Sequence, residues 1–187
     1  MPTARIDLVW SSDELRSAEH FTLRQAPGSS TLSGTAVLAA DDVPCHVDYR
    51  VEVDDGWRTV SAEAEVERAG HQSFRMEVDD GRWTVDGVRR TDLDGCLDVD
   101  LGWTPATNLL PIHRLGLAVG EADTIEAAWL RFPELELVRS TQEYERVGDD
   151  TYTYRSGPYE FLLRTTPEGV VSRYGDDLWV ATSVVRS

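Results

Sequence analysis

The feature that most constrains the fold is a strict alternation of apolar and polar residues between short acidic turns. In the segment 49–53, apolar side chains at odd positions alternate with charged side chains at even positions. The same period of two recurs at 60–66 and 74–78. This pattern is typical of half-buried antiparallel strands, and it predicts a mainly β chain.

Pairs of aspartate separate the alternating segments and lie at 41–42, 54–55, 79–80, 149–150 and 176–177. Four of the five pairs adjoin a glycine. An aspartate side chain bonds its own backbone and glycine accepts positive φ, so these sequences favour β-turns. The chain is therefore expected to fold as a series of hairpins.

One hairpin occurs twice, as RVEVDDGWRTV (50–60) and RMEVDDGRWTV (75–85). If the strand register runs straight from each turn, Trp83 lies on the apolar face while Trp57 lies on the polar face, beside Thr59. A tryptophan on a polar face has a partner or a ligand, or packs at the rim of the core. Trp57 is therefore a candidate ligand contact.

One short helix is expected at 111–118, because Pro111 suits a first helical position and Gly120 would end the helix. The segment 125–132 (IEAAWLRF) fits either a helix or a strand, since its apolar residues match both periods. Pro133 would stop a helix after two or three turns, which favours the strand. The short helix would be marginal alone and must be covered by the sheet.

Length and charge limit the function. A chain of 187 residues suits one domain, here 1–187. Its formal net charge of −16 disfavours nucleic acid and anionic membrane surfaces as partners. All 18 basic residues are arginine, which excludes Schiff-base catalysis and the P-loop lysine.

Cysteine content and the N-terminal sequence indicate a reduced, cytoplasmic protein. Cys45 and Cys96 are the two cysteines and form no CxxC pair, so no zinc or redox centre is expected. The N-terminal 16 residues lack the apolar core of a signal peptide, and no run has the length of a transmembrane helix. No metal, cofactor or membrane insertion is predicted.

The acidic stretch 91–101 (TDLDGCLDVDL) allows three interpretations. An EF-hand loop is excluded, because the required oxygen ligands and glycine are not at the right positions. A strand at 96–101 would place Asp98 and Asp100 on one face, with both carboxylates pointing away from the apolar side. Structural or solvated carboxylates, ligand hydrogen bonding and catalysis by the pair then all remain open. Catalytic carboxylates of glycosidases usually flank the bond from opposite sides of a cleft.

A family resemblance is carried by 87–121, by AAWLRFPELELV (127–138) and by QEYERV (142–147). The central block TPATNLLPIHRL (104–115) follows the D-x-D strand, and together these segments resemble the glycolipid-binding family first catalogued as a domain of unknown function. His113 and Leu109 depart from the family pattern, which tends to have arginine and threonine at these two positions.

The resemblance implies a long curved antiparallel sheet, or spiral β-roll, wrapped around a single α-helix. It also implies a homodimer and the binding of a glycolipid or another amphipathic small molecule. The leading hypothesis is therefore a non-enzymatic protein that holds such a ligand on the concave face of the sheet. The candidate ligand-binding residues are Trp57, Asp98, Asp100, Trp103, Thr107, Asn108, His113, Arg114 and Trp129.

Two alternatives belong to other functional classes. One is a hydrolase that uses Asp98 or Asp100 together with His113, although GxSxG, HExxH and GxGxxG are all missing from the sequence. A lone histidine is more often structural than catalytic. The other alternative is an obligate dimer that acts as an interaction module, with tryptophan-rich faces at the interface.

Overall fold

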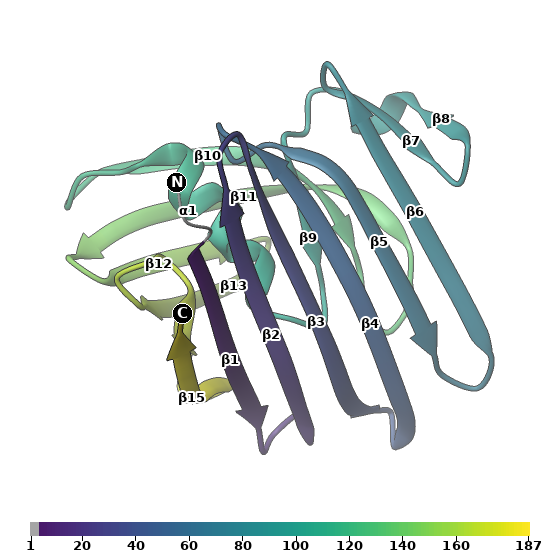
Figure 1. Cartoon of the computed structure of the whole chain (residues 1–187), viewed down its shortest axis with the longest axis horizontal. Helices are drawn as coiled ribbons and strands as arrows, with labels where there is room; N and C mark the ends of the chain where they lie inside the picture. The colour runs from purple at the N-terminus through teal and green to yellow at the C-terminus, as the bar shows by residue number, and fades with distance from the viewer. Residues whose placement is uncertain (1–3) are drawn as a thin grey trace.

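The computed structural model describes residues 4–187, which form one 15-stranded sheet (Figure 1). In space the strands run from β8 to β1 and then from β15 to β9, so the first strand pairs with the last. Every neighbouring pair is antiparallel except the parallel pair β9–β10. The expected mainly β fold, a curved sheet around one helix, is confirmed. Residues 1–3 lie outside the described residues. They belong to the N-terminal 16 residues, for which no signal peptide is predicted.

The elements fall into three groups along the chain. The first half of the sheet contains β1 (Ala4–Ser12), β2 (Ser17–Ala26), β3 (Ser29–Ala40), β4 (Val43–Asp54), β5 (Thr59–Glu67), β6 (His71–Asp79), β7 (Arg82–Val85) and β8 (Val88–Arg90). The central segment contains the 3-10 helices η1 (Thr91–Leu93) and η2 (Ala106–Asn108), the strand β9 (Asp98–Leu101) and the helix α1 (Leu109–Leu115). The second half contains β10 (Ala122–Leu130), β11 (Leu137–Gly148), β12 (Thr151–Ser156), β13 (Tyr159–Thr165), β14 (Val171–Tyr174) and β15 (Trp179–Arg186).

Acidic turns connect the strands as the sequence predicts. Asp41 and Asp42 join β3 to β4 with φ values of 50° and 61°, and Asp80 and Gly81 join β6 to β7 with 47° and 70°. Two successive positive φ values are typical of type I′ turns, whose twist matches that of the flanking strands. The repeated segment forms the predicted hairpins β4–β5 and β6–β7.

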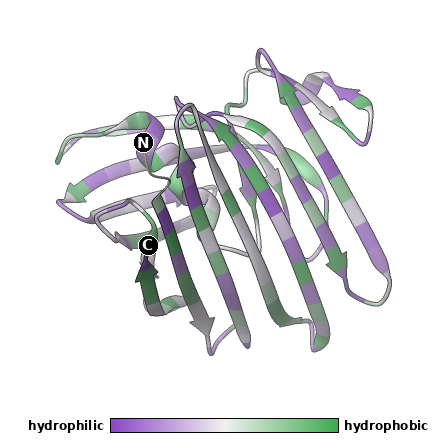
Figure 2. Ribbon diagram, viewed as in Figure 1, coloured by the Kyte–Doolittle hydropathy of each residue, from purple (hydrophilic) through white to green (hydrophobic). Residues whose placement is uncertain are grey.

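The central segment lies between the two halves of the sheet, where it separates two apolar cores (Figure 1). Strands β1 to β7 pack against β9 and η2 in the larger core, and β10 to β14 pack against α1 in the smaller one. The helix belongs to both, since Leu109 and Leu110 lie in the larger core and Ile112 in the smaller. Hydrophobic and hydrophilic residues alternate along the strands of the first half (Figure 2), which leaves one face of that half for the core.

The helix is shorter and begins earlier than the predicted 111–118. It runs from Leu109 to Leu115 and ends because Gly116 adopts a left-handed conformation, with φ of 56°. The expectation that Gly120 ends the helix is therefore wrong. The ambiguous segment 125–132 lies mostly in β10, so the strand interpretation is confirmed.

Trp57 does not lie on a polar strand face. The ladder between β4 and β5 shifts register at Glu52/Val53, and Trp57 sits in the connecting turn with φ of 61°. Its ring stacks on His113 of α1, with ring centroids 4.0 Å apart and planes 7° from parallel. The edge of the imidazole is also held, by a 2.7 Å hydrogen bond between Nε2 and the carbonyl oxygen of Glu168. This stack ties the first half of the sheet to the helix.

Gly169 packs directly against this histidine. An added Cβ at Gly169, where φ is +79°, would lie 2.7 Å from Nε2 of His113. Gly157 also has positive φ, of +54°, but a Cβ there would meet nothing within 4 Å. We expect Gly157→Ala to lower the free energy of unfolding by about 1 kcal/mol through backbone strain alone. Gly169→Ala should lower it by about 1–3 kcal/mol more through overpacking. Equal losses in denaturant titrations would contradict this packing.

Glu19 of β2 connects the first half of the sheet to the loop that precedes η2. It is 1% exposed, and its Oε1 accepts hydrogen bonds from the hydroxyls of Tyr49 (2.5 Å) and Thr104 (2.8 Å). Thr104 also accepts the amide hydrogen of Ala106, at 3.0 Å. The Oε2 atom has no hydrogen-bond partner, and burial raises the pKa of Glu19 to about 7.

Glu19 makes stability depend on pH. Because its pKa rises from 4.5 to about 7 on folding, the folded state holds a proton that the unfolded state releases between these values. Its contribution to stability is therefore present below pH 4.5 and is lost as pH rises to about 7, by about 3 kcal/mol. We expect Glu19→Gln to remove this part of the pH dependence in denaturant titrations. The exposed control Glu65→Gln should keep it, and parallel curves for wild type and Glu19→Gln would refute the assignment.

Candidate functional site

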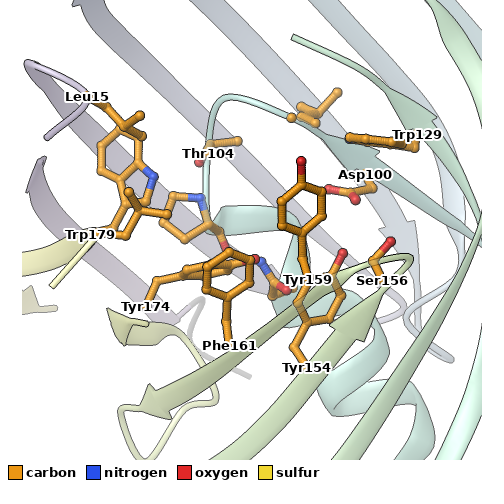
Figure 3. Close-up of a pocket in the computed structure, with 15 residues that line it drawn as sticks. Leu15, Asp100, Thr104, Trp129, Tyr154, Ser156, Tyr159, Phe161, Tyr174 and Trp179 are labelled. Atoms are coloured by element: carbon orange, nitrogen blue, oxygen red, sulfur yellow. The ribbon is translucent and has the colours of Figure 1, made fainter. Parts of the chain in front are cut away.

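A pocket of about 270 Å³ opens beside η2, on the concave side of the second half of the sheet (Figure 3). Strands β10, β12, β13, β14 and β15 contribute to its wall, and the β1–β2 turn contributes Leu15 at its edge. Six aromatic residues line it: Trp129, Tyr154, Tyr159, Phe161, Tyr174 and Trp179.

The aromatic side chains pack against one another along the wall. The rings of Phe161 and Tyr174 are 4.9 Å apart, and those of Tyr159 and Phe161 are 6.2 Å apart and nearly parallel. They come from neighbouring strands on the same face, because Tyr154 pairs with Phe161 across β12 and β13. Period-two alternation therefore projects these rings toward the pocket.

Polar groups occupy the end of the pocket formed by the central segment. Asp100 of β9 and Asn108 of η2 line this end, and Figure 3 places Asp100 near Trp129 and Ser156. Asn108 is held in place because its Nδ2 donates to the carbonyl oxygen of Pro105, and its Oδ1 accepts from the hydroxyl of Tyr144, 2.9 Å away.

Asp100 binds neutral donors. Its Oδ1 accepts a hydrogen bond from the hydroxyl of Thr107 (3.2 Å), and its Oδ2 accepts one from Nε2 of Gln142 (2.6 Å). Burial raises the pKa of Asp100, and these two hydrogen bonds act in the opposite direction. A carboxylate offers about four lone-pair sites, so Asp100 can accept further hydrogen bonds from a ligand.

Asp98 has a charged partner instead. Its side chain is 2% exposed, and Arg114 of α1 donates to both carboxylate oxygens, at 3.1 and 2.5 Å. Burial raises the pKa of Asp98, whereas the guanidinium of Arg114 lowers it. This fork ties β9 to the helix.

Asp98 and Asp100 share a face of β9 as predicted, and they point away from the larger core, which contains Val99 and Leu101. Of the alternatives left open, the structure shows bonded carboxylates, because Asp98 is buried and Asp100 is half-buried. The parallel partner β10 aligns Asp98 with Ala127 and Asp100 with Trp129, which face the smaller core and the pocket. Both faces of β9 are therefore covered, because the chain folds a second layer over the acidic side.

The nine candidate residues separate into three groups. Asp100, Asn108 and Trp129 line the pocket, and Thr107 binds Asp100 from beneath. Asp98 and Arg114 form the adjacent ion pair. The remaining three residues lie elsewhere: Trp57, Trp103 and His113.

Trp103 and His113 have structural surroundings. Trp103 is 2% exposed and makes edge contacts with Tyr49 and Phe132 in the larger core. Burial lowers the pKa of His113, whose Nε2 is bonded to the backbone of Glu168. His113 lines a different hollow from the one that contains Asp100, so the structure does not assemble the acid–histidine pair of a hydrolase.

Sequence reasoning missed most of the aromatic wall. Tyr154, Tyr159 and Phe161 lie in segments that the sequence predicts as strands, whereas Tyr174 and Trp179 match the family pattern weakly. The alternation of aromatic and polar residues in YTYRSGPYEF (152–161) is a usable signal for Tyr154, Tyr159 and Phe161, because it places their rings in one stripe on one face. No local pattern indicates that this stripe faces the D-x-D strand.

Metal-binding clusters and membrane-spanning helices are both missing from residues 4–187. No group of three or more histidine, cysteine, aspartate or glutamate residues there is placed to hold a metal ion. None of the helices in this part of the chain combines the length and the apolar character needed to cross a membrane.

Comparisons with known proteins agree with the fold. The model of a family described as "Putative glycolipid-binding" matches residues 7–179. The crystal structure of a DUF1089 family protein from Pseudomonas aeruginosa is similar, with a TM-score of 0.75 and 31% identity over 89% of this chain and 90% of that chain.

A more distant structure shares the fold alone. This is a β-barrel-like protein of the DUF1849 domain from Brucella abortus, with a TM-score of 0.53 and 11% identity over 99% of this chain and 97% of that chain. No curated protein matches the sequence. Because the family model spans nearly the whole chain, the protein belongs to the family described as "Putative glycolipid-binding".

Proposed function

We propose that the protein is a non-enzymatic binding protein for a glycolipid, and that the aromatic pocket beside η2 takes its sugar headgroup. The observation that carries the proposal is the combination of six aromatic side chains with Asp100 and Asn108 around one hollow. Aromatic rings supply large, rigid apolar surfaces for the C–H faces of a sugar ring. The carboxylate and amide supply the few placed polar groups that orient its hydroxyls.

The size of the pocket supports a headgroup rather than a whole lipid. Its volume of about 270 Å³ lies just below the range of about 300–1,000 Å³ typical of small-molecule sites. One sugar ring suits this space, and the proposal places the acyl chains outside it. The apolar part of the ligand would leave past Leu15, which is 38% exposed.

This arrangement changes the expected position of the acyl chain. The concave face beneath α1 was expected to hold it, but side chains of the two cores fill that space. Leu109 and Leu110 of α1 are 1% and 0% exposed. The proposed ligand therefore lies beside the central helix and not between the helix and the sheet.

The pocket favours binding over hydrolysis. Acid–base cleavage of a glycosidic bond usually needs two carboxyl groups, one on each side of the bond. The pocket lining contains one carboxylate and no histidine, and Asp98 is already bound by Arg114. The homodimer and the cytoplasmic location stay predictions.

The test compares two variants of strand β13 by isothermal titration calorimetry with octyl glucoside below its micelle concentration. Tyr159→Ala removes a half-exposed ring at the pocket, and Leu162→Ala removes an exposed apolar side chain on the opposite face of the same strand. Neither change should unfold the protein. We expect octyl glucoside to bind the wild type and Tyr159→Ala to weaken binding about tenfold, since one stacking contact is worth about 1–1.5 kcal/mol.

Leu162→Ala should bind as tightly as the wild type. If the wild type gives no binding heat, or if both variants lose affinity equally, the pocket is not the sugar site. A titration with methyl glucoside separates the headgroup from the alkyl chain, and it should show weaker binding with the same ranking of variants.

A further inference from the structure

The charge of the pocket constrains the headgroup further than its shape does. Among its lining residues, one is a carboxylate and none is an arginine or a histidine. Four other hollows in the described part of the chain each include at least one arginine. The pocket therefore has no group that would compensate a phosphate or a uronic acid, and such ligands are disfavoured.

Asp100 is a half-buried carboxylate without a counter-ion. Both of its partners, the Thr107 hydroxyl and the Gln142 amide, are neutral. Asp98, two residues earlier on the same strand, does have a counter-ion, because Arg114 neutralises it through two hydrogen bonds. A positive charge on a ligand in the pocket would neutralise Asp100, as the guanidinium of Arg114 neutralises Asp98.

The aromatic wall favours the same charge. The face of an aromatic ring carries partial negative charge, and a cation over such a face is attracted by about 0.5–2 kcal/mol. Cages of aromatic side chains are a recurrent means of binding ammonium groups. Figure 3 shows Tyr154, Tyr159 and Phe161 around the hollow that Asp100 borders.

We propose that the pocket selects a headgroup bearing a protonated amine, and specifically an amino sugar. This inference rests on the proposed function and narrows it. The ammonium would lie against the aromatic faces and donate to Asp100, while Asn108 and Ser156 are placed to bond the hydroxyls. The net charge of −16 on the whole chain adds a general attraction for a cationic ligand.

The experiment measures the affinities of four octyl glycosides that share one alkyl chain. They are the glucoside, the glucosaminide, the N-acetylglucosaminide and the glucuronide, titrated at pH 6.5 and below their micelle concentrations. We expect the glucosaminide to bind at least tenfold more tightly than the glucoside. The N-acetyl compound, which has the same nitrogen without the charge, should lose this preference, and the glucuronide should bind most weakly.

Two variants assign the preference to Asp100. Asp100→Asn should bring the ratio of the glucosaminide and glucoside affinities close to one. Glu65→Gln, which removes an equal charge from the exposed surface, should keep the wild-type ratio. Thermal melts establish that both variants are folded, and the comparison of glucosaminide with its N-acetyl derivative in the wild type needs no variant.

The outcomes separate the two proposals. Equal affinities for glucosaminide and glucoside in the wild type overturn the amino-sugar inference and leave the proposed function standing. A preference that survives in Asp100→Asn also overturns it. Octyltrimethylammonium distinguishes a sugar from a simple ammonium group, and its binding as tightly as the glucosaminide would overturn the assignment to a sugar. If no glycoside binds, the proposed function fails as well.

Discussion

One short strand carries a buried and a half-buried carboxylate, and this is the constraint on which the rest of the structure depends. Strand β9 carries Asp98 and Asp100 between two layers of the sheet, where an uncompensated charge is costly. Arg114 neutralises the charge of Asp98 and thereby fixes the position of α1. Thr107 and Gln142 compensate the charge of Asp100 only in part, because they contribute hydrogen bonds and no charge.

This difference between the two acids connects the fold to the site. Arg114 donates to both carboxylate oxygens of Asp98, so Asp98 has a structural role. The second acid lies at the border of a pocket with free lone pairs, beside an amide that Tyr144 and Pro105 hold in place. A spiral sheet around a short helix thus places one carboxylate, which has neutral partners and no counter-ion, next to six aromatic rings.

Much of the fold could be predicted from the sequence, because its signals are local. Period-two alternation and the Asp-Gly turns located the hairpins, and the β10 segment was recognised from its flanking proline. The errors and the open alternatives arose where distant segments decide the outcome. The register shift at Glu52/Val53 turned Trp57 inward, and a second layer covered the acidic face of β9. The alternation singled out the D-x-D pair, and the family resemblance singled out Asn108 and Trp129. The aromatic wall from β12 to β15 could not be assigned to the site in this way, because it reaches the site only where the sheet curves back over η2.

The central claim is that a sugar ring occupies the pocket bordered by Asp100. A crystal structure of the protein soaked with an octyl glycoside tests it most directly. We expect a sugar ring against the faces of Tyr154 and Phe161, with one polar group of the ring within hydrogen-bond distance of Asp100 and the alkyl chain leaving past Leu15. A ring found instead in the hollow near Pro44 and His46, or an unchanged aromatic pocket at saturating ligand, would contradict it.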